Sequence, residues 1–117
     1  MIVSIKQIIE NARQKKYAVG AFNTSNLEIT LAIVRAAVAE KSPVIIQTSE
    51  SAIKYSNLAV LFNIIVTVAN TIGKSVPIAI HLDHGRDPQL VKQCIDIGYN
   101  SVHMDASEKD FATNVRL

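Results

Sequence analysis

Short apolar runs alternate with longer amphipathic stretches along this chain, and this alternation constrains the fold more than any other feature. The strand-like runs lie at residues 18–23, 44–48, 78–83 and 101–105. Strands spaced 20 to 35 residues apart, with helix-like stretches between them, are typical of βαβ units. The chain is therefore expected to form an α/β fold with a parallel sheet.

Capping residues predict where the helices begin and end. Ser4 and Ser25 each precede Gln or Glu by three positions, which is the capping-box pattern. Helices are expected at about 4–15, 25–41, 57–72 and 88–97, with another from about residue 110. Gly73 and Gly98 are predicted to end two of them, because glycine readily adopts the left-handed conformation that follows a helix.

One face of each predicted strand becomes polar toward the carboxyl end. Side chains alternate between the two faces, so the final inward-facing residues of the four strands are Asn23, Ser49, Asp83 and Asp105. In a parallel sheet these ends share one edge, which predicts one polar site there. A polar inner face favours a barrel, whereas a sheet whose polar face is simply solvated is the alternative.

The segment His81-Leu82-Asp83-His84-Gly85 concentrates two imidazoles and a carboxylate at a strand end. Imidazole is a common metal ligand, and a neighbouring carboxylate can transfer protons. Asp105 on the inferred inner face supports this metal or acid–base interpretation. A plain turn, in which Asp83 caps the next helix and the imidazole is solvated, explains the segment as well, and both interpretations stay open.

Other polar residues have ordinary structural explanations. Residues 48–51 carry hydroxyls that suit an anion, although turn chemistry explains them equally well. His103 faces inward by parity, as a hydrogen-bonded core histidine would. Cys94 lies in an apolar helical stripe, so its side chain is expected to be buried.

Charge and composition exclude several classes of partner. Twelve basic and ten acidic residues are spread along the chain and give a net charge of +2, so no nucleic-acid partner is expected. The most apolar run, residues 58–72, is too short and too polar to span a bilayer, so no membrane partner is expected. The single cysteine suits a reducing compartment, which predicts a cytoplasmic protein.

The chain resembles the class II, zinc-dependent fructose-bisphosphate aldolases in four ordered motifs. These are Tyr17-Ala-Val-Gly-Ala-Phe-Asn23, Lys41-Ser-Pro-Val-Ile-Ile-Gln47 with Ser49, Ile80-His-Leu-Asp-His-Gly85, and Gly98-Tyr-Asn-Ser-Val102 with Asp105-Ala-Ser107 and Asn114-Val115. The resemblance covers essentially the whole chain. It implies a parallel (β/α)8 TIM barrel of about 250 residues, of which residues 1–117 would be the amino-terminal half, with about four β/α units.

The resemblance also implies a lyase of glycolysis and gluconeogenesis. The reaction would be cleavage of a sugar bisphosphate, fructose 1,6-bisphosphate, to dihydroxyacetone phosphate and glyceraldehyde 3-phosphate, with Zn²⁺ as a Lewis acid. By resemblance Asp83 is the catalytic acid, His84 a zinc ligand, and Asp105 a residue of a second divalent metal position. Ser49 and Asn23 would bind substrate, Ser49 at the glyceraldehyde 3-phosphate portion. A homo-oligomer, dimer or tetramer, is expected.

Two departures from the family pattern leave alternatives open. The family usually has Met-Ile where this chain has His103-Met104. The family also takes two further zinc ligands from later strands, so the 117 residues alone are expected to be inactive. The alternatives are a tagatose-bisphosphate aldolase, which shares these motifs, and a non-catalytic half-barrel that pairs through open sheet edges.

Overall fold

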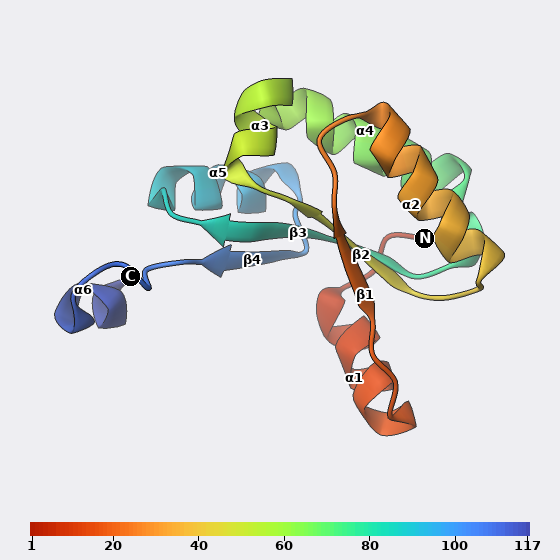
Figure 1. The fold of residues 1–117 in the computed structure, drawn as a ribbon, viewed down its shortest axis with the longest axis horizontal. Helices are drawn as coiled ribbons and strands as arrows, with labels where there is room; N and C mark the ends of the chain where they lie inside the picture. Colours follow the sequence, from red (N-terminus) through yellow and green to blue (C-terminus); the bar gives the residue numbers. More distant parts are fainter.

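The four predicted strands form one parallel sheet in the computed structural model, which describes residues 1–117 (Figure 1). The strands are β1 (Gly20–Asn23), β2 (Val44–Thr48), β3 (Ile78–Gly85) and β4 (Ser101–Met104). The helices are α1 (Ile5–Lys15), α2 (Leu27–Ala39), α3 (Glu50–Ser56), α4 (Leu58–Thr71), α5 (Pro88–Ile97) and α6 (Phe111–Arg116), with a short 3-10 helix η1 (Gly73–Ser75). The predicted α/β class is confirmed.

The strands lie side by side in the order in which they occur along the chain. β1 pairs with β2, β2 with β3 and β3 with β4, all in parallel. An open doubly wound sheet reverses its strand order at a switch point, whereas a barrel keeps it sequential. The order therefore matches part of a barrel, and it places all four carboxyl ends at one edge.

The two faces of the sheet have different cores. Helices α2, α4 and α5 cover the outer face, where Ile46, Ile80 and Leu82 are buried. On the inner face, Ile45 and Ala79 pack against Ile8 of α1, and Figure 1 shows α1 on the side of the sheet opposite to α2 and α4. Burial of a large aliphatic side chain contributes about 1.5–3 kcal/mol. The inner face is therefore apolar at its amino end and left polar at its carboxyl end.

Two helix starts differ from the prediction, and one predicted helix end has a different backbone conformation. The cap of α2 is Asn26, whose Oδ1 accepts the N–H of Ile29 at 2.9 Å, so Ser25 is not the cap. Residues 50 and 51, predicted as part of a turn, begin α3 after the N-cap Ser49. Gly73 follows the C-cap Ile72 of α4, as predicted, but it does not adopt the left-handed conformation; a Cβ there would lie 2.5 Å from the side chain of Ile78.

The apolar helix α4 belongs to the core, as predicted from its composition. Its residues Leu61, Ile65, Val68 and Ala69 are buried. No single helix has the length and apolar character needed to cross a membrane, and α3 and α4 meet that test only as a pair bent by 96°.

Candidate active site

The candidate site lies at the carboxyl edge of the sheet, beside an irregularity in β3. Leu82 pairs with Val102 and Gly85 with Met104, so Asp83 and His84 together lie opposite one residue of β4. An extra residue of this kind re-aims side chains that regular alternation would separate. His84 has a φ of 52°, a conformation that non-glycine residues adopt rarely and often at functional sites. The irregularity therefore lets two consecutive polar residues serve one site.

Four of the predicted site residues form a continuous polar chain. Nδ2 of Asn23 donates to Oδ2 of Asp83 at 3.3 Å. Oδ1 of Asp83 lies 3.8 Å from Nε2 of His84, and Nδ1 of His84 lies 2.7 Å from Oδ2 of Asp105. Residues from β1, β3 and the segment after β4 thus meet at one edge, as the polar strand ends predicted.

Asp105 is the charged anchor of this chain. Its Oδ1 accepts hydrogen bonds from the hydroxyl and the backbone N–H of Ser107, at 2.7 and 3.0 Å. These bonds, together with the bond to His84, hold the pKa of Asp105 well below its usual range. An ionised carboxylate only accepts hydrogen bonds, so Nδ1 of His84 carries the proton. In a neutral imidazole Nε2 of His84 is then the nitrogen with the lone pair, as in carboxylate–histidine pairs that support a metal.

Three side chains at this edge are placed to hold a metal ion. Asp83, His84 and His103 each offer a ligand atom, and these atoms all lie within 4.8 Å of one another. Imidazole nitrogen and carboxylate oxygen are donors that Zn²⁺ takes in catalytic sites. The donor set therefore fits zinc.

His103 is not the core histidine that its parity favoured. Its side chain is exposed, and its ring centroid lies 4.6 Å from that of His84. The inward parity of His103 was the signal that could have placed it in the site.

His81, the remaining histidine, lies outside this group. Its Nδ1 is 2.8 Å from Oγ of Ser101, which joins β3 to β4. Burial lowers the pKa of His81. Its ring therefore links two strands.

Ser49 lies close to these residues but has a structural role of its own. Its Oγ caps α3 by accepting the N–H of Ala52 at 3.2 Å and lies 2.9 Å from Oγ of Ser51. It lines a hollow that it shares with Asp83, His84 and Asp105 and that no hydrophobic side chain lines. Ser49 is thus next to the polar chain without being hydrogen-bonded to it.

Glu50 and Arg86 were not singled out in the sequence, although both border the site. Oε1 of Glu50 accepts the backbone N–H of Arg86 at 2.6 Å and that of Asp87 at 2.9 Å. Nε of Arg86 lies 3.9 Å from Oδ2 of Asp105. Glu50 and Arg86 are 36 positions apart, so no local pattern signals this contact.

A sequentially ordered parallel sheet with imidazole and carboxylate groups at its carboxyl edge is the arrangement of an α/β-barrel enzyme site. The family model "Fructose-bisphosphate aldolase class-II" matches residues 3–117, and the chain belongs to this family. The family resemblance seen in the sequence is therefore confirmed.

Named relatives and a solved structure agree with this assignment. The chain is 46% identical to a fructose-bisphosphate aldolase of Streptococcus pneumoniae, over 99% of this chain and 40% of the relative. It is 44% identical to that of Geobacillus stearothermophilus, over 99% of this chain and 41% of the relative. The crystal structure of the YdjI aldolase from Escherichia coli K12 superposes with a TM-score of 0.90 at 32% identity, over 100% of this chain and 45% of that one. The chain spans about 40% of the length of these curated relatives.

Proposed function

We propose that this chain forms the amino-terminal part of the active site of a zinc-dependent aldolase. The reaction is the reversible cleavage of fructose 1,6-bisphosphate to dihydroxyacetone phosphate and glyceraldehyde 3-phosphate. The observation that carries the proposal is the pairing of His84 with Asp105, which leaves Nε2 of His84 free beside Asp83. The names of the relatives support fructose bisphosphate over tagatose bisphosphate. A homo-oligomeric state and a cytoplasmic location stay predictions.

His84 is the residue of this chain that we propose as a zinc ligand, through Nε2. Asp105 holds the imidazole in place through Nδ1, at 2.7 Å. When bound, Zn²⁺ supplies Lewis-acid polarisation of the substrate's oxygens. A second divalent metal position at Asp105 also stays a prediction. Both carboxylate oxygens of Asp105 already accept hydrogen bonds in this structure.

Asp83 is proposed to move the proton that the reaction requires. In cleavage, the C3–C4 bond breaks, the C4 hydroxyl proton passes to the carboxylate of Asp83, and C4 becomes the aldehyde carbon. The electron pair of the broken bond remains on the dihydroxyacetone phosphate fragment, which a proton later quenches. In condensation Asp83 returns its proton to the aldehyde oxygen.

Two further residues are proposed to position the reacting groups. Nδ2 of Asn23 holds Oδ2 of Asp83 at 3.3 Å, so Oδ1 is the oxygen left to exchange the proton. Ser49 borders the same hollow, where its hydroxyl is proposed to contact the glyceraldehyde 3-phosphate portion.

The replacement Asp83→Ala in the full-length protein tests this assignment. We expect cleavage to fall by about 100- to 10,000-fold, because the proton-transfer group is lost, while the zinc content stays unchanged. The matched control is Asp96→Asn on the exposed surface of α5, where Asp96 pairs only with Lys92; its activity is expected to equal that of the wild type. Loss of zinc from Asp83→Ala would instead show that Asp83 holds the metal.

A further inference from the structure

We infer that His103 binds the same metal ion as His84, so that this chain supplies two imidazole ligands. The inference rests on the proposed zinc site at His84 and adds a ligand to it.

The register between β3 and β4 brings His103 to the metal position. Val102 and Met104 pair with Leu82 and Gly85, so His103 lies opposite the two residues of the irregular part of β3. The pairing on either side of His103 holds its backbone in place. The pairing of β3 with β4 therefore places the imidazole of His103 beside that of His84.

The distances suit a shared ion. In a tetrahedral zinc site with bonds of about 2.0–2.1 Å, two ligand atoms lie about 3.4 Å apart. The donor atoms of His84, His103 and Asp83 lie within 4.8 Å of one another. His84 is held by Asp105, whereas the side chain of His103 is exposed. A separation of up to 4.8 Å must therefore shorten by about 1.4 Å for one ion to bind both rings.

No side-chain hydrogen bond or ion pair engages the imidazole of His103, and its ring contact is with His84, at a centroid distance of 4.6 Å. The rings of His84 and His103 are tilted by 53°, so they do not stack in parallel. The other imidazole, that of His81, is engaged by Ser101 at 2.8 Å. Imidazole nitrogen is a ligand that both Zn²⁺ and Co²⁺ accept.

Titration of the metal-free, full-length protein with Co²⁺, a spectroscopic substitute for Zn²⁺, tests the inference. In His103→Asn we expect the Co²⁺ affinity to fall by at least about 100-fold, the upper end of what is lost when a residue only supports a ligand. In His103→Cys, under reducing conditions, we expect the affinity to recover to within about tenfold, because thiolate is also a metal ligand. A thiolate-to-cobalt charge-transfer absorption should appear in this variant alone.

The wild type is the baseline for that absorption, because its one cysteine, Cys94, is 0% exposed in the apolar core. Circular dichroism checks that each variant is folded. Unchanged affinity in His103→Asn, or no charge-transfer absorption in His103→Cys, would overturn the inference. If His103→Asn fails in this way but His84→Asn no longer binds Co²⁺, the inference is overturned while the proposed metal site at His84 is still supported. Equal binding by the wild type and His84→Asn would overturn the site at His84 and the inference with it.

Discussion

At the scale of single residues, buried polar side chains find partners far away in the sequence. Oγ1 of Thr48 and the hydroxyl of Tyr99 lie 2.9 Å apart, although 51 positions separate them. Oδ1 of Asn100 accepts the backbone N–H of Ile80 at 3.0 Å. No buried side-chain nitrogen or oxygen lacks a partner. Leaving one unpaired costs about 1–3 kcal/mol, so these bonds help hold β4 in register behind the site.

Buried weak acids predict a loss of stability at high pH. Burial raises the pKa of Tyr99 from 10.0 to about 12 and that of Cys94 from 9.0 to about 11. These groups ionise in the unfolded chain before they ionise in the folded one. Their contribution to the free energy of unfolding is therefore complete below about pH 9 and is lost as the pH rises to about 12. Tyr99 accounts for up to about 3 kcal/mol of this loss.

Urea unfolding at a series of pH values measures this loss. The variant Tyr99→Phe should be less stable near neutral pH, since Thr48 loses its partner, and should show a shallower decline above pH 10 than the wild type. Equal declines in the two proteins would show that Tyr99 is not the group responsible.

At the scale of elements, the turn after β3 is held by a residue from a different connection. Glu50, the first residue of α3, accepts the backbone N–H groups of Arg86 and Asp87 at 2.6 and 2.9 Å. That turn follows His84, whose left-handed backbone is sparsely populated and must be stabilised by its surroundings. α3 therefore supports the conformation of the proposed metal ligand.

Removing this support predicts weaker metal binding. In Glu50→Ala we expect the metal affinity to fall by about tenfold, as for residues that support a ligand, and the stability by about 1 kcal/mol. Glu50→Gln keeps an acceptor oxygen and should restore most of the affinity. Glu10→Ala, which removes an exposed carboxylate of α1 that pairs with Lys6, should leave it unchanged. Calorimetric titration with Zn²⁺ measures all three, and full affinity in Glu50→Ala would contradict the supporting role.

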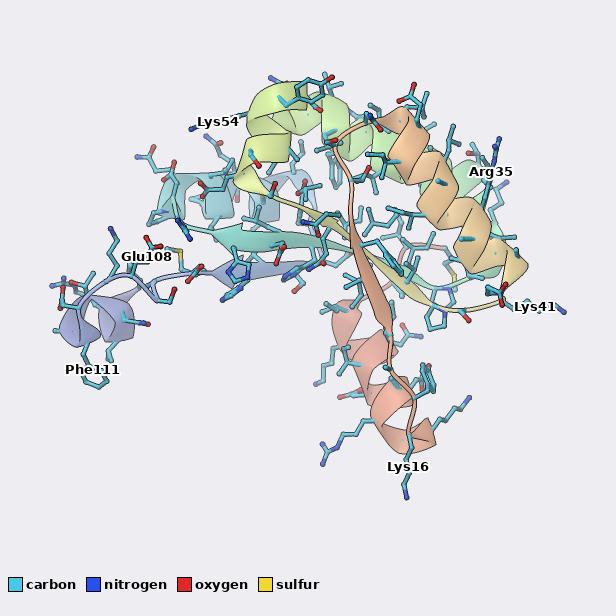
Figure 2. The ribbon with its side chains drawn as sticks, viewed as in Figure 1. Lys16, Arg35, Lys41, Lys54, Glu108 and Phe111 are labelled. Carbon is cyan, nitrogen blue, oxygen red and sulfur yellow. The ribbon has the colours of Figure 1, made fainter.

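At the scale of the whole molecule, both edges of the sheet and several apolar side chains are exposed. All four residues of β1 are exposed, and Phe22 is 53% exposed beside an apolar groove that Tyr17 and Ile33 also line. At the other end, Phe111 of α6 is 85% exposed, and Figure 2 shows it pointing away from the rest of the chain. Exposed parallel edges of this kind readily pair with other strands.

We therefore predict that the purified 117-residue chain associates in a concentration-dependent way. Phe22→Lys should reduce the association, because it places a charge on the exposed edge. Ile95→Lys is the matched control, since Ile95 is 54% exposed but lies on the helix α5 rather than on a strand. Sedimentation velocity measures the association, and a clean monomer at high concentration would contradict the prediction.

Predictions from local patterns succeeded where the structure depends on residues close together in the chain. The strand Val44–Thr48 and the helix that begins after Asp87 and ends at Gly98 lie where they were predicted, with Gly98 at a φ of 120°. The cap of α2 was misplaced by one residue, because Ser25 and Asn26 are both good capping residues and only the backbone geometry selects Asn26. The shared polar edge could be predicted because parallel strands align their carboxyl ends.

The sequence by itself therefore determined the order of helices and strands, the parallel sheet and the set of polar residues at its carboxyl edge. Only the tertiary structure decided that the polar atoms of Asp83, His84 and His103 lie together, and that Glu50 binds the turn after β3. The physical reason is distance along the chain. Helix caps and strand alternation depend on neighbouring residues, whereas the irregular pairing of β3 with β4 and the bond of Glu50 to Arg86 join segments about 20 to 36 positions apart.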